Sequence, residues 1–316
     1  MKYRFEFHPY QRQFKQPLVT SHGLWKVRKG IIVRLTDTKG RKGLGEIAPL
    51  EWFGSESFEQ ALEFCTQLPS EITRDDILAI SPKLSACQFG FESALENITL
   101  PFDQISSPIS KPTNFSALLP SGQAALESWK KFWNQGYRTF KWKIGIISLT
   151  DELKILSQLA QVLPADVKLR LDANGGLKFF EAVELLKICD RIGIEFLEQP
   201  LPPTELEAML KLSTEFSTLL ALDESVATLH QLKSCYEYGW QDIFVIKPAI
   251  AGSPSLLRCF CQTYQIDTVF SSVFETLIGQ KFALKLSKEL SKNKRADGFG
   301  VNHWFANNDI FSEFKI

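Results

Sequence analysis

The chain has 316 residues, of which 44% are hydrophobic and 23% charged, and its 36 basic and 36 acidic side chains cancel. This composition excludes a disordered chain, and zero net charge gives no general attraction to nucleic acid or anionic lipid. No apolar run approaches the roughly 20 residues of a membrane-spanning helix, and the first residues lack a signal peptide's apolar stretch. We therefore expect a globular cytoplasmic protein with neither a nucleic acid nor a membrane as its partner.

The six cysteines are scattered along the chain, mostly within apolar or helical segments. In a chain of this size without an export signal, they do not predict a disulfide framework. Cys259 and Cys261 lack the nearby second Cys or His pair that a zinc site requires. The cysteines therefore indicate neither disulfides nor zinc.

The first hundred residues mix alternating strands with amphipathic helices. The opening "MKYRFEFHPY" alternates as a strand does, and residues 23–50 predict two further strands joined at the turn-forming "DTKG". Residues 56–68 and 85–98 carry apolar side chains at helical spacing. Residues 101–115 are rich in Pro and Ser and predict a crossing between domains. We expect an α+β capping domain over residues 1–110.

After this crossing, short apolar strands alternate with amphipathic helices about eight times. The acidic and basic strand-end residues 172, 198, 223 and 247 follow one another at intervals of 26, 25 and 24 positions. A repeating βα unit of this length predicts a parallel (β/α) barrel, here over residues 111–296. Residues 297–316 are expected to supply the last strand and a segment returning to the cap. The predicted strands are 115–120, 137–145, 167–175, 194–201, 219–225, 242–250, 267–275 and, less regularly, 296–301.

The second of these strands, "YRTFKWKIG", carries two lysines on one face. Because side chains alternate along a strand, Lys141 and Lys143 leave one side while Phe140, Trp142 and Ile144 leave the other. In an antiparallel sheet the lysines would simply face water, but a parallel barrel strand has helices on one side and a packed interior on the other. Two lysines in that setting require opposite charges nearby.

Three consecutive strands end in carboxylates: Asp172 in "RLDANGG", Glu198 in "FLEQPL" and Asp223 in "ALDES". Barrel sites are built at that end, and three carboxylates that meet there repel one another unless a cation shares the site. Hard oxygen ligands match Mg²⁺ or Mn²⁺. The alternative is that each acid caps the helix after it. Their recurrence on sequential strands favours metal ligation.

Lys247 follows on the next strand, where Pro248 indicates a strand end at the rim. Two lysines then face a third across three acids. This set suits abstraction of a proton next to a carboxylate, because a divalent metal and an ammonium stabilise the enediolate that forms. A lysine base must be largely neutral, a form that neighbouring positive charge favours.

With these residues the chain resembles the enolase superfamily, in its muconate-lactonizing subgroup. The resemblance implies a modified (β/α)7β barrel with an α+β cap and one divalent cation. It also implies catalytic roles for Lys141, Lys143 and Lys247 and metal ligation by Asp172, Glu198 and Asp223. Gln199 and Glu224 are expected to support these ligands, and Asn174, Ser271 and Gly298 to contact the substrate.

Within the superfamily, residues 43–61 are similar to the cap of the o-succinylbenzoate synthase family, and "FSSVFET" resembles its seventh-strand stretch. The resemblance implies a lyase that dehydrates a succinyl-bearing cyclohexadiene carboxylate in menaquinone or phylloquinone biosynthesis. Lys143 would remove the proton and return it to the departing hydroxyl, and Lys247 would stabilise the anion. Two alternatives stay open: an N-acylamino acid racemase or epimerase that uses both lysines as bases, and a non-catalytic barrel that binds a partner.

Other signals are weaker. "GLGEIA" (43–48) matches half of a dinucleotide fingerprint, but Pro49 follows at once and no βαβ unit surrounds it. We expect its glycines to allow a tight path of strand and cap loop over the barrel mouth. Trp25, Trp52 and Phe53 suit either an apolar pocket or core packing. The role of His22 and the oligomeric state do not follow from the sequence.

Overall fold

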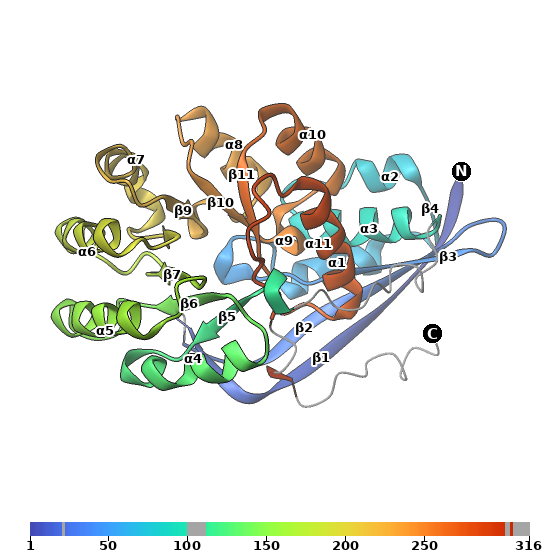
Figure 1. Cartoon of the computed structure of the whole chain (residues 1–316). Helices are drawn as coiled ribbons and strands as arrows, with labels where there is room; N and C mark the ends of the chain where they lie inside the picture. The colour runs from blue at the N-terminus through green and yellow to red at the C-terminus, as the bar shows by residue number, and fades with distance from the viewer. Residues whose placement is uncertain (21–22, 100–111, 301–303, 306–316) are drawn as a thin grey trace.

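A computed structural model of the chain describes residues 1–20, 23–99, 112–300 and 304–305. Figure 1 shows a long antiparallel sheet with its helices beside a ring of βα units. None of the described helices is both long enough and apolar enough to cross a membrane. His22 and residues 100–111 lie outside the described residues, so the expected interdomain crossing is described only from Pro112.

The N-terminal unit is a four-stranded antiparallel sheet in the order β3-β2-β1-β4, as the alternating sequence predicts. Helices α1 and α2 begin at polar caps: Ser57 accepts a hydrogen bond from the Gln60 N–H, and Thr73 accepts one from the Asp76 N–H. The elements are β1 (Lys2–Thr20), β2 (Gly23–Thr36), β3 (Lys42–Ile47), η1 (Glu51–Phe53), α1 (Phe58–Gln67), β4 (Glu71–Thr73), α2 (Arg74–Leu78) and α3 (Ser85–Asn97).

The "GLGEIA" segment is strand β3, not a nucleotide-binding turn, and its glycines serve helix packing. A Cβ on Gly43 would lie 1.9 Å from the carbonyl oxygen of Ala94, and one on Gly45 would lie 1.9 Å from that of Gly90. Helix α3 therefore reaches the sheet only because both positions lack a side chain. The tight path expected of the strand is thus present, but the expected place of these glycines in a cap loop over the barrel mouth was wrong, because both lie within β3.

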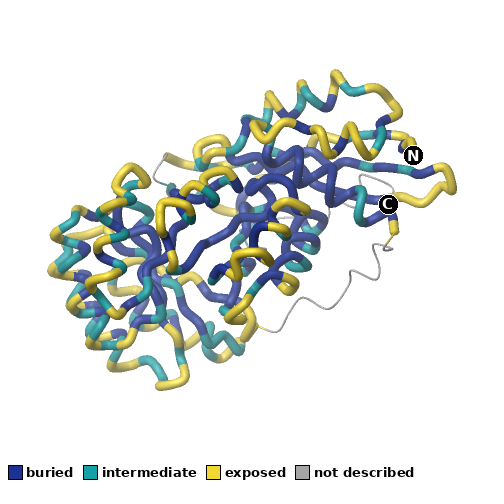
Figure 2. Tube along the Cα trace, turned by 90° about the horizontal axis from the view of Figure 1, so that it is seen from above, coloured by how far each residue is buried: buried dark blue, intermediate teal, exposed yellow. Residues whose placement is uncertain are grey.

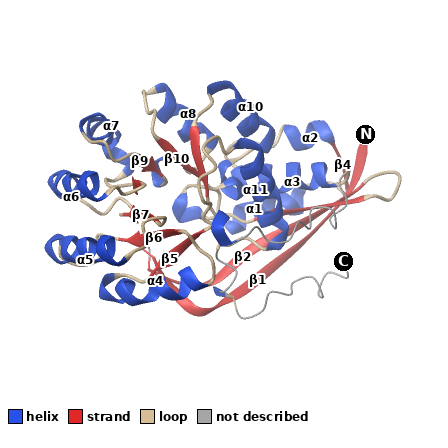
Figure 3. Cartoon of the chain, viewed as in Figure 1, coloured by secondary structure: helices blue, strands red, loops and turns tan. Residues whose placement is uncertain are grey.

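The larger unit is a seven-stranded parallel sheet in the order β11-β10-β9-β8-β7-β6-β5, with helices outside it (Figure 3). Its first half comprises η3 (Pro112–Asn114), β5 (Ser116–Leu119), η4 (Gly122–Ala124), α4 (Ala125–Asn134), β6 (Thr139–Lys143), α5 (Leu149–Val162), β7 (Lys168–Asp172), α6 (Phe179–Ile192), β8 (Phe196–Glu198) and η5 (Pro203–Glu205). Its second half comprises α7 (Leu206–Glu215), β9 (Leu220–Leu222), η6 (Glu224–Val226), α8 (Leu229–Glu237), β10 (Ile243–Ile246), α9 (Pro248–Ala251), α10 (Pro254–Tyr264), β11 (Asp267–Phe270) and α11 (Leu277–Leu290).

Residues 297–298 close this sheet into a barrel. The Asp297 N–H donates to the Asn114 carbonyl at 2.8 Å, and the Ser116 N–H donates to the Asp297 carbonyl at 2.8 Å. On the other edge, the Gly298 N–H donates to the Phe270 carbonyl at 2.7 Å. The expected eighth strand is thus present as isolated bridges to β5 and β11.

Two bands of buried residues run through the molecule, one inside the barrel and one between the cap sheet and its helices (Figure 2). The six cysteines are free, and only Cys259 is exposed. At the seam between the two units, the buried Glu46 of β3 accepts hydrogen bonds from the N–H groups of Thr276 (2.8 Å) and Gly279 (2.9 Å). The carboxylate, which belongs to the other unit, thereby accepts hydrogen bonds from backbone N–H groups at the start of α11 that have no partner within the helix.

Candidate active site

Three acidic side chains lie at the mouth, by which we mean the C-terminal ends of the barrel strands and the residues that directly follow. Asp172 ends β7, Glu198 ends β8 and pairs with Asp172 in the parallel register, and Asp223 directly follows β9. All three are at least 94% buried, with exposed fractions of 6%, 2% and 4%. The βα repeat brings them together because consecutive parallel strands are neighbours in the barrel.

Two lysines neutralise part of this acidic charge. The Lys141 ammonium contacts an Asp172 oxygen at 2.7 Å and a Glu198 oxygen at 2.6 Å, and Lys247 forms a close ion pair with Asp223. Both lysines reach the acids from neighbouring strands, β6 and the end of β10. The prediction that Lys141 faces opposite charge inside the barrel is confirmed.

Lys143 differs from Lys141 although both leave the same face of β6. Among the described residues, no group accepts a hydrogen bond from the Lys143 ammonium or forms an ion pair with it. Its side chain is only half-buried, and its charge still lowers the pKa of Asp172. This lysine is therefore close to the acids without being held by them.

The acids themselves are unevenly compensated. Burial and the charge of Asp172 raise the pKa of Glu198 to about 7, and burial raises the pKa of Asp223 to about 6 despite Lys247. Burial opposes the charge on Lys141, but Asp172, Glu198 and Asp223 outweigh it and hold its pKa well above the ordinary value. The cluster carries more acid than its two bound lysines balance, so a further cation would be favourable here.

Gln199 holds the ends of two strands together. Its amide Nε2 donates to the Ser225 hydroxyl at 2.8 Å, and its Oε1 accepts the Asp223 N–H at 2.9 Å. The residue is fully buried and has φ of 36°, a left-handed backbone that is uncommon outside glycine. Gln199 thus fixes the backbone that carries Asp223; its role in supporting a metal ligand stays a prediction.

Asn174 and Glu224 form a second polar pair beside the acids. The Asn174 amide donates to Glu224 Oε1 at 3.0 Å, and its backbone N–H donates to Asp172 Oδ1 at 3.0 Å. Burial raises the pKa of Glu224, and its Oε2 is buried without a hydrogen-bond partner. Asn174 also has a positive φ, of 44°. The pair leaves one unsatisfied oxygen next to the acidic cluster.

Helix capping does not account for the acids at the strand ends. The helix after β7 has Lys178 at its N-cap, and the helix after η5 has Glu205. Asp223 precedes η6, but its side chain accepts no capping hydrogen bond. The capping alternative is therefore wrong for Asp172 and Glu198, and for Asp223 it supplies no contact.

Ser271 and Gly298 lie side by side at the far edge of the mouth, joined by a parallel bridge. A Cβ on Gly298 would lie 2.8 Å from the Ser271 hydroxyl oxygen, so any larger residue here would require the Ser271 side chain to move. From the cap, the Phe53 ring lies 4.1 Å from the Lys247 ammonium, a cation–π contact. Trp52 contacts both Phe53 and Trp25, with ring centroids 6.0 and 5.8 Å apart.

The donor set fits a hard divalent cation. Asp172, Glu198 and Asp223 offer only carboxylate oxygens, and two of the three have raised pKa values that a cation would reverse. Within the described ranges, no three His, Cys, Asp or Glu side chains are gathered closely enough to form a finished metal cage. The ammonium groups of Lys141 and Lys247 draw the acids to themselves instead.

Known families match both units of the chain. The enolase C-terminal domain-like model matches residues 124–314, and the MenC N-terminal domain model matches residues 3–98. An o-succinylbenzoate synthase of Thermosynechococcus vestitus is 40% identical over 309 residues, which cover 95% of this chain and 93% of that protein. The chain belongs to the o-succinylbenzoate synthase family.

Solved structures agree with this assignment. The crystal structure of an o-succinylbenzoate synthase from Thermosynechococcus elongatus BP-1, complexed with Mg in the active site, has a TM-score of 0.88 and 38% identity. It covers 95% of this chain, which covers 94% of it. An L-Ala-D/L-Glu epimerase from Bacillus subtilis shares the fold alone, with a TM-score of 0.77 and 21% identity over 96% of this chain and 91% of its own.

The predicted family and the predicted capped barrel are thus confirmed. Sequence reasoning missed several polar residues that shape this synthase-family site. Glu152 at the start of α5 is buried, and its carboxylate accepts the N–H groups of Gly145 and Ile146, each at 2.9 Å, directly after Lys143. Glu275, after β11, accepts the Ser272 hydroxyl at 2.7 Å. An acid in the first turn of a helix is a usable signal for Glu152; no comparable signal marks Glu275.

Proposed function

We propose that the chain is an o-succinylbenzoate synthase that dehydrates 2-succinyl-6-hydroxy-2,4-cyclohexadiene-1-carboxylate to 2-succinylbenzoate in menaquinone or phylloquinone biosynthesis. The observation that carries the proposal is the meeting of Lys141 and Lys247 with three buried acids at one barrel mouth. The similarity of the whole chain to the o-succinylbenzoate synthase of Thermosynechococcus vestitus supports the choice of substrate. We expect the enzyme to act in the cytoplasm on this small carboxylate.

We further propose that Asp172, Glu198 and Asp223 hold one divalent cation, Mg²⁺ or Mn²⁺. The relative from Thermosynechococcus elongatus was crystallised with Mg in its active site, and the uncompensated acids of this chain favour the same choice. When bound, the cation neutralises the substrate carboxylate and makes the adjacent C–H bond more acidic. Gln199 and Asn174 keep the ligand-bearing backbone in place through the contacts described above.

Lys143 carries the proton in the proposed reaction. Its neutral amine takes a proton from the ring carbon that bears the carboxylate. The electron pair of the broken C–H bond is then delocalised into the carboxylate. The resulting ammonium then gives that proton to the departing hydroxyl, so that the C–O bond breaks and water leaves. The electrons return to form the aromatic ring. Lys143 suits the task because no described residue holds its ammonium in an ion pair.

The other two lysines act as fixed charges. Lys141 is kept protonated by Asp172 and Glu198, so it stabilises negative charge on the substrate carboxylate without exchanging a proton. Lys247, paired with Asp223 and covered by the Phe53 ring, stabilises the anionic intermediate. Asn174, Ser271 and Gly298 remain the proposed substrate contacts.

The direct test is turnover of the cyclohexadiene carboxylate by the Mg²⁺-loaded enzyme, followed by appearance of the aromatic product. We expect turnover with a kcat within the usual enzyme range of about 1–1000 s⁻¹. A parallel incubation with an N-succinylamino acid in D₂O distinguishes the racemase alternative. Rapid α-proton exchange without any dehydration of the cyclohexadiene would refute the proposal.

A further inference from the structure

Strand β5 contains one apolar residue, Leu118, that is unusually exposed for a strand of a packed barrel. Ser116, Ala117 and Leu119 are exposed by 8%, 4% and 2%, whereas Leu118 between them is 51% exposed. Both faces of a parallel barrel strand are normally covered, the outer one by helices and the inner one by layers of branched side chains. A half-exposed leucine in such a strand therefore marks a place where the interior remains open.

The sheet register shows which way Leu118 points. It pairs with Lys141 in the neighbouring parallel strand, and paired residues in a parallel sheet share one face. The Lys141 side chain is directed inward, because its ammonium contacts Asp172 and Glu198. Leu118 therefore faces the inside of the mouth, next to the lysine that touches the acids.

The other neighbour of β5 is the segment that closes the barrel. Phe115, just before β5, forms a parallel bridge with Asp297, and Gly298 forms one with Ser271. The inner face of β5 thus lies between Lys141 on one side and the Ser271–Gly298 edge on the other. Leu118 occupies the position between Lys141 and the proposed substrate contacts Ser271 and Gly298.

The loop that leaves β6, the strand paired with β5, also carries exposed apolar residues. Ile146 and Ile147 are 54% and 45% exposed. Their backbone N–H groups donate to the buried Glu152 carboxylate at 2.9 and 3.3 Å, which holds the loop in one conformation. Two isoleucines on this loop expose hydrocarbon to water at a cost that binding an apolar group would remove.

We propose that Leu118 is a specificity residue that packs against the hydrocarbon part of the substrate, meaning its ring and the methylene groups of its succinyl chain. This inference rests on the proposed function. A ligand that reaches the acids with a carboxylate must lay its next atoms along the inner wall, and on the β5 side that wall is an aliphatic side chain. A substrate with a polar group at that position is disfavoured, because the leucine offers it no hydrogen bond.

The test replaces Leu118 by Asn, of similar size but polar, and by Met, which stays apolar. We expect Leu118→Asn to raise KM about 10–100-fold with kcat within about threefold, because the contact binds a non-reacting part of the substrate. Leu118→Met should stay within about threefold of the wild type in both constants. Leu256→Asn is the matched control, since Leu256 is 52% exposed on α10 and should leave KM unchanged.

The dissociation constant of 2-succinylbenzoate, measured by calorimetry on the Mg²⁺-loaded enzyme, separates this inference from the proposed reaction. Weaker binding by Leu118→Asn, with binding retained by Leu118→Met, supports the inference even if the wild type turns over no cyclohexadiene. Unchanged KM and unchanged product affinity in Leu118→Asn would overturn it. So would a fall in kcat alone, which would place the effect of Leu118 on the chemistry rather than on binding.

Discussion

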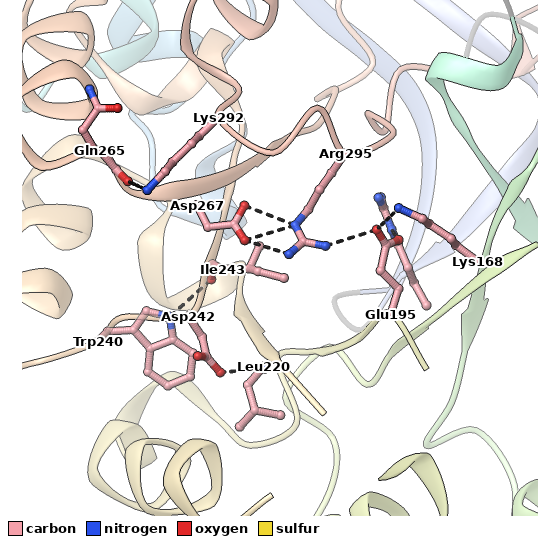
Figure 4. Close-up of polar contacts among 11 residues, drawn as sticks. Lys168, Glu195, Leu220, Trp240, Asp242, Ile243, Gln265, Asp267, Lys292 and Arg295 are labelled. Atoms are coloured by element: carbon pink, nitrogen blue, oxygen red, sulfur yellow. Dashed lines mark hydrogen bonds and ion pairs between the residues drawn. The ribbon is translucent and has the colours of Figure 1, made fainter. Parts of the chain in front are cut away.

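Buried charges gather at both ends of the barrel, and the two clusters are built differently. At the floor, meaning the N-terminal ends of the strands, Glu195 accepts contacts from Lys168 at 3.4 Å, Arg170 at 2.6 Å and Arg295 at 3.2 Å. Arg295 also forms an ion pair with Asp267, in which the Nη2 of Arg295 donates to Oδ2 of Asp267 at 2.7 Å (Figure 4). Glu195 and Asp267 thus each meet an arginine in charge-assisted hydrogen bonds.

The pKa of Glu195 at the floor shifts in the opposite direction to those of Glu198 and Asp223 at the mouth. Burial works against ionisation of Glu195, but the charge of Arg170, joined by those of Lys168 and Arg295, outweighs it and lowers the pKa. At the mouth, burial prevails and raises the pKa of Glu198 to about 7 and that of Asp223 to about 6. Glu195 at the floor is thus compensated by its own neighbours, whereas Glu198 and Asp223 at the mouth favour a further cation.

The largest effect that would separate the two ends is removal of the metal. Excess chelator should reduce dehydration at least about 1000-fold, and added Mg²⁺ should restore it, because the metal supplies several kcal/mol of charge stabilisation at the reacting carboxylate. Product formation measures both. The floor has no part in this, so the ordered barrel should persist in chelator by circular dichroism. Full turnover in chelator would refute metal ligation by the three acids.

Exchanging one lysine at each end sharpens the comparison. Lys143→Ala should lower kcat by about 1000-fold or more, since it removes the proposed base and acid, and should leave the melting temperature nearly unchanged because no described residue pairs with it. Lys168→Ala is the control: its side chain is 61% exposed at the floor, and kcat should stay within about twofold. Equal kinetics in both variants would show that the base has been misplaced.

Breaking the floor should do the reverse, costing stability without affecting catalysis. Glu195→Gln keeps the shape of the side chain but leaves Arg170 and Arg295 without its charge, so the free energy of unfolding should fall by about 4 kcal/mol. Urea denaturation measures the loss, and kcat of the folded enzyme should not change. The exposed Glu237→Gln is the control. A variant that loses activity but no stability would contradict this division of roles.

The elements and the acids could be predicted because their signals are local and periodic. Asp172, Glu198 and Asp223 end consecutive strands at nearly constant spacing, and parallel neighbours in sequence become neighbours in space. Contacts made by single side chains across long separations carry no such period. Glu46 meets Thr276 across 230 positions, and the exposure of Leu118 follows from how far the interior is filled. Neither leaves a pattern that a single sequence shows.

The segment around Gly298 illustrates an intermediate case. Its position in the repeat predicted an eighth strand, yet the chain forms only isolated bridges there. Those bridges suffice to close the barrel because this segment makes a backbone hydrogen bond with each edge strand. The Ser116 N–H of β5 donates to the Asp297 carbonyl, and the Gly298 N–H donates to the Phe270 carbonyl of β11. The order of elements was therefore predictable, while the number of ladder bonds was not.

The smallest predicted effect concerns Glu275, which lies beside the mouth but is not one of the proposed ligands. Burial raises its pKa to about 7, although its Oε2 accepts the Ser272 hydroxyl and the Val273 N–H, both at 2.7 Å. Its Oε1 is buried without a hydrogen-bond partner. In an unfolded chain a glutamate titrates near pH 4.3. The folded protein therefore keeps this proton to a higher pH than the unfolded chain does.

The sign of the pH dependence follows from that difference. Between about pH 4.3 and pH 7 the folded state binds more protons at this group, so the contribution of Glu275 to stability falls as the pH rises and is constant above about pH 7. The loss amounts to at most about 4 kcal/mol. Glu195, with its lowered pKa, has the opposite sign: its contribution is present above the unfolded pKa and is lost as the pH falls.

Glu275→Gln, which is neutral at every pH, isolates this contribution. Urea denaturation from pH 4.5 to pH 8 measures the free energy of unfolding of this variant and of the wild type. The value for the variant should rise relative to that of the wild type up to about pH 7, and above that pH the difference should be constant. Glu237→Gln should follow the wild type throughout, since Glu237 is exposed. Parallel curves for Glu275→Gln over the whole range would mean that Glu275 is ionised in the folded protein. Raised carboxyl pKa values at the mouth would then not extend beyond the proposed metal ligands and their immediate neighbours to Glu275.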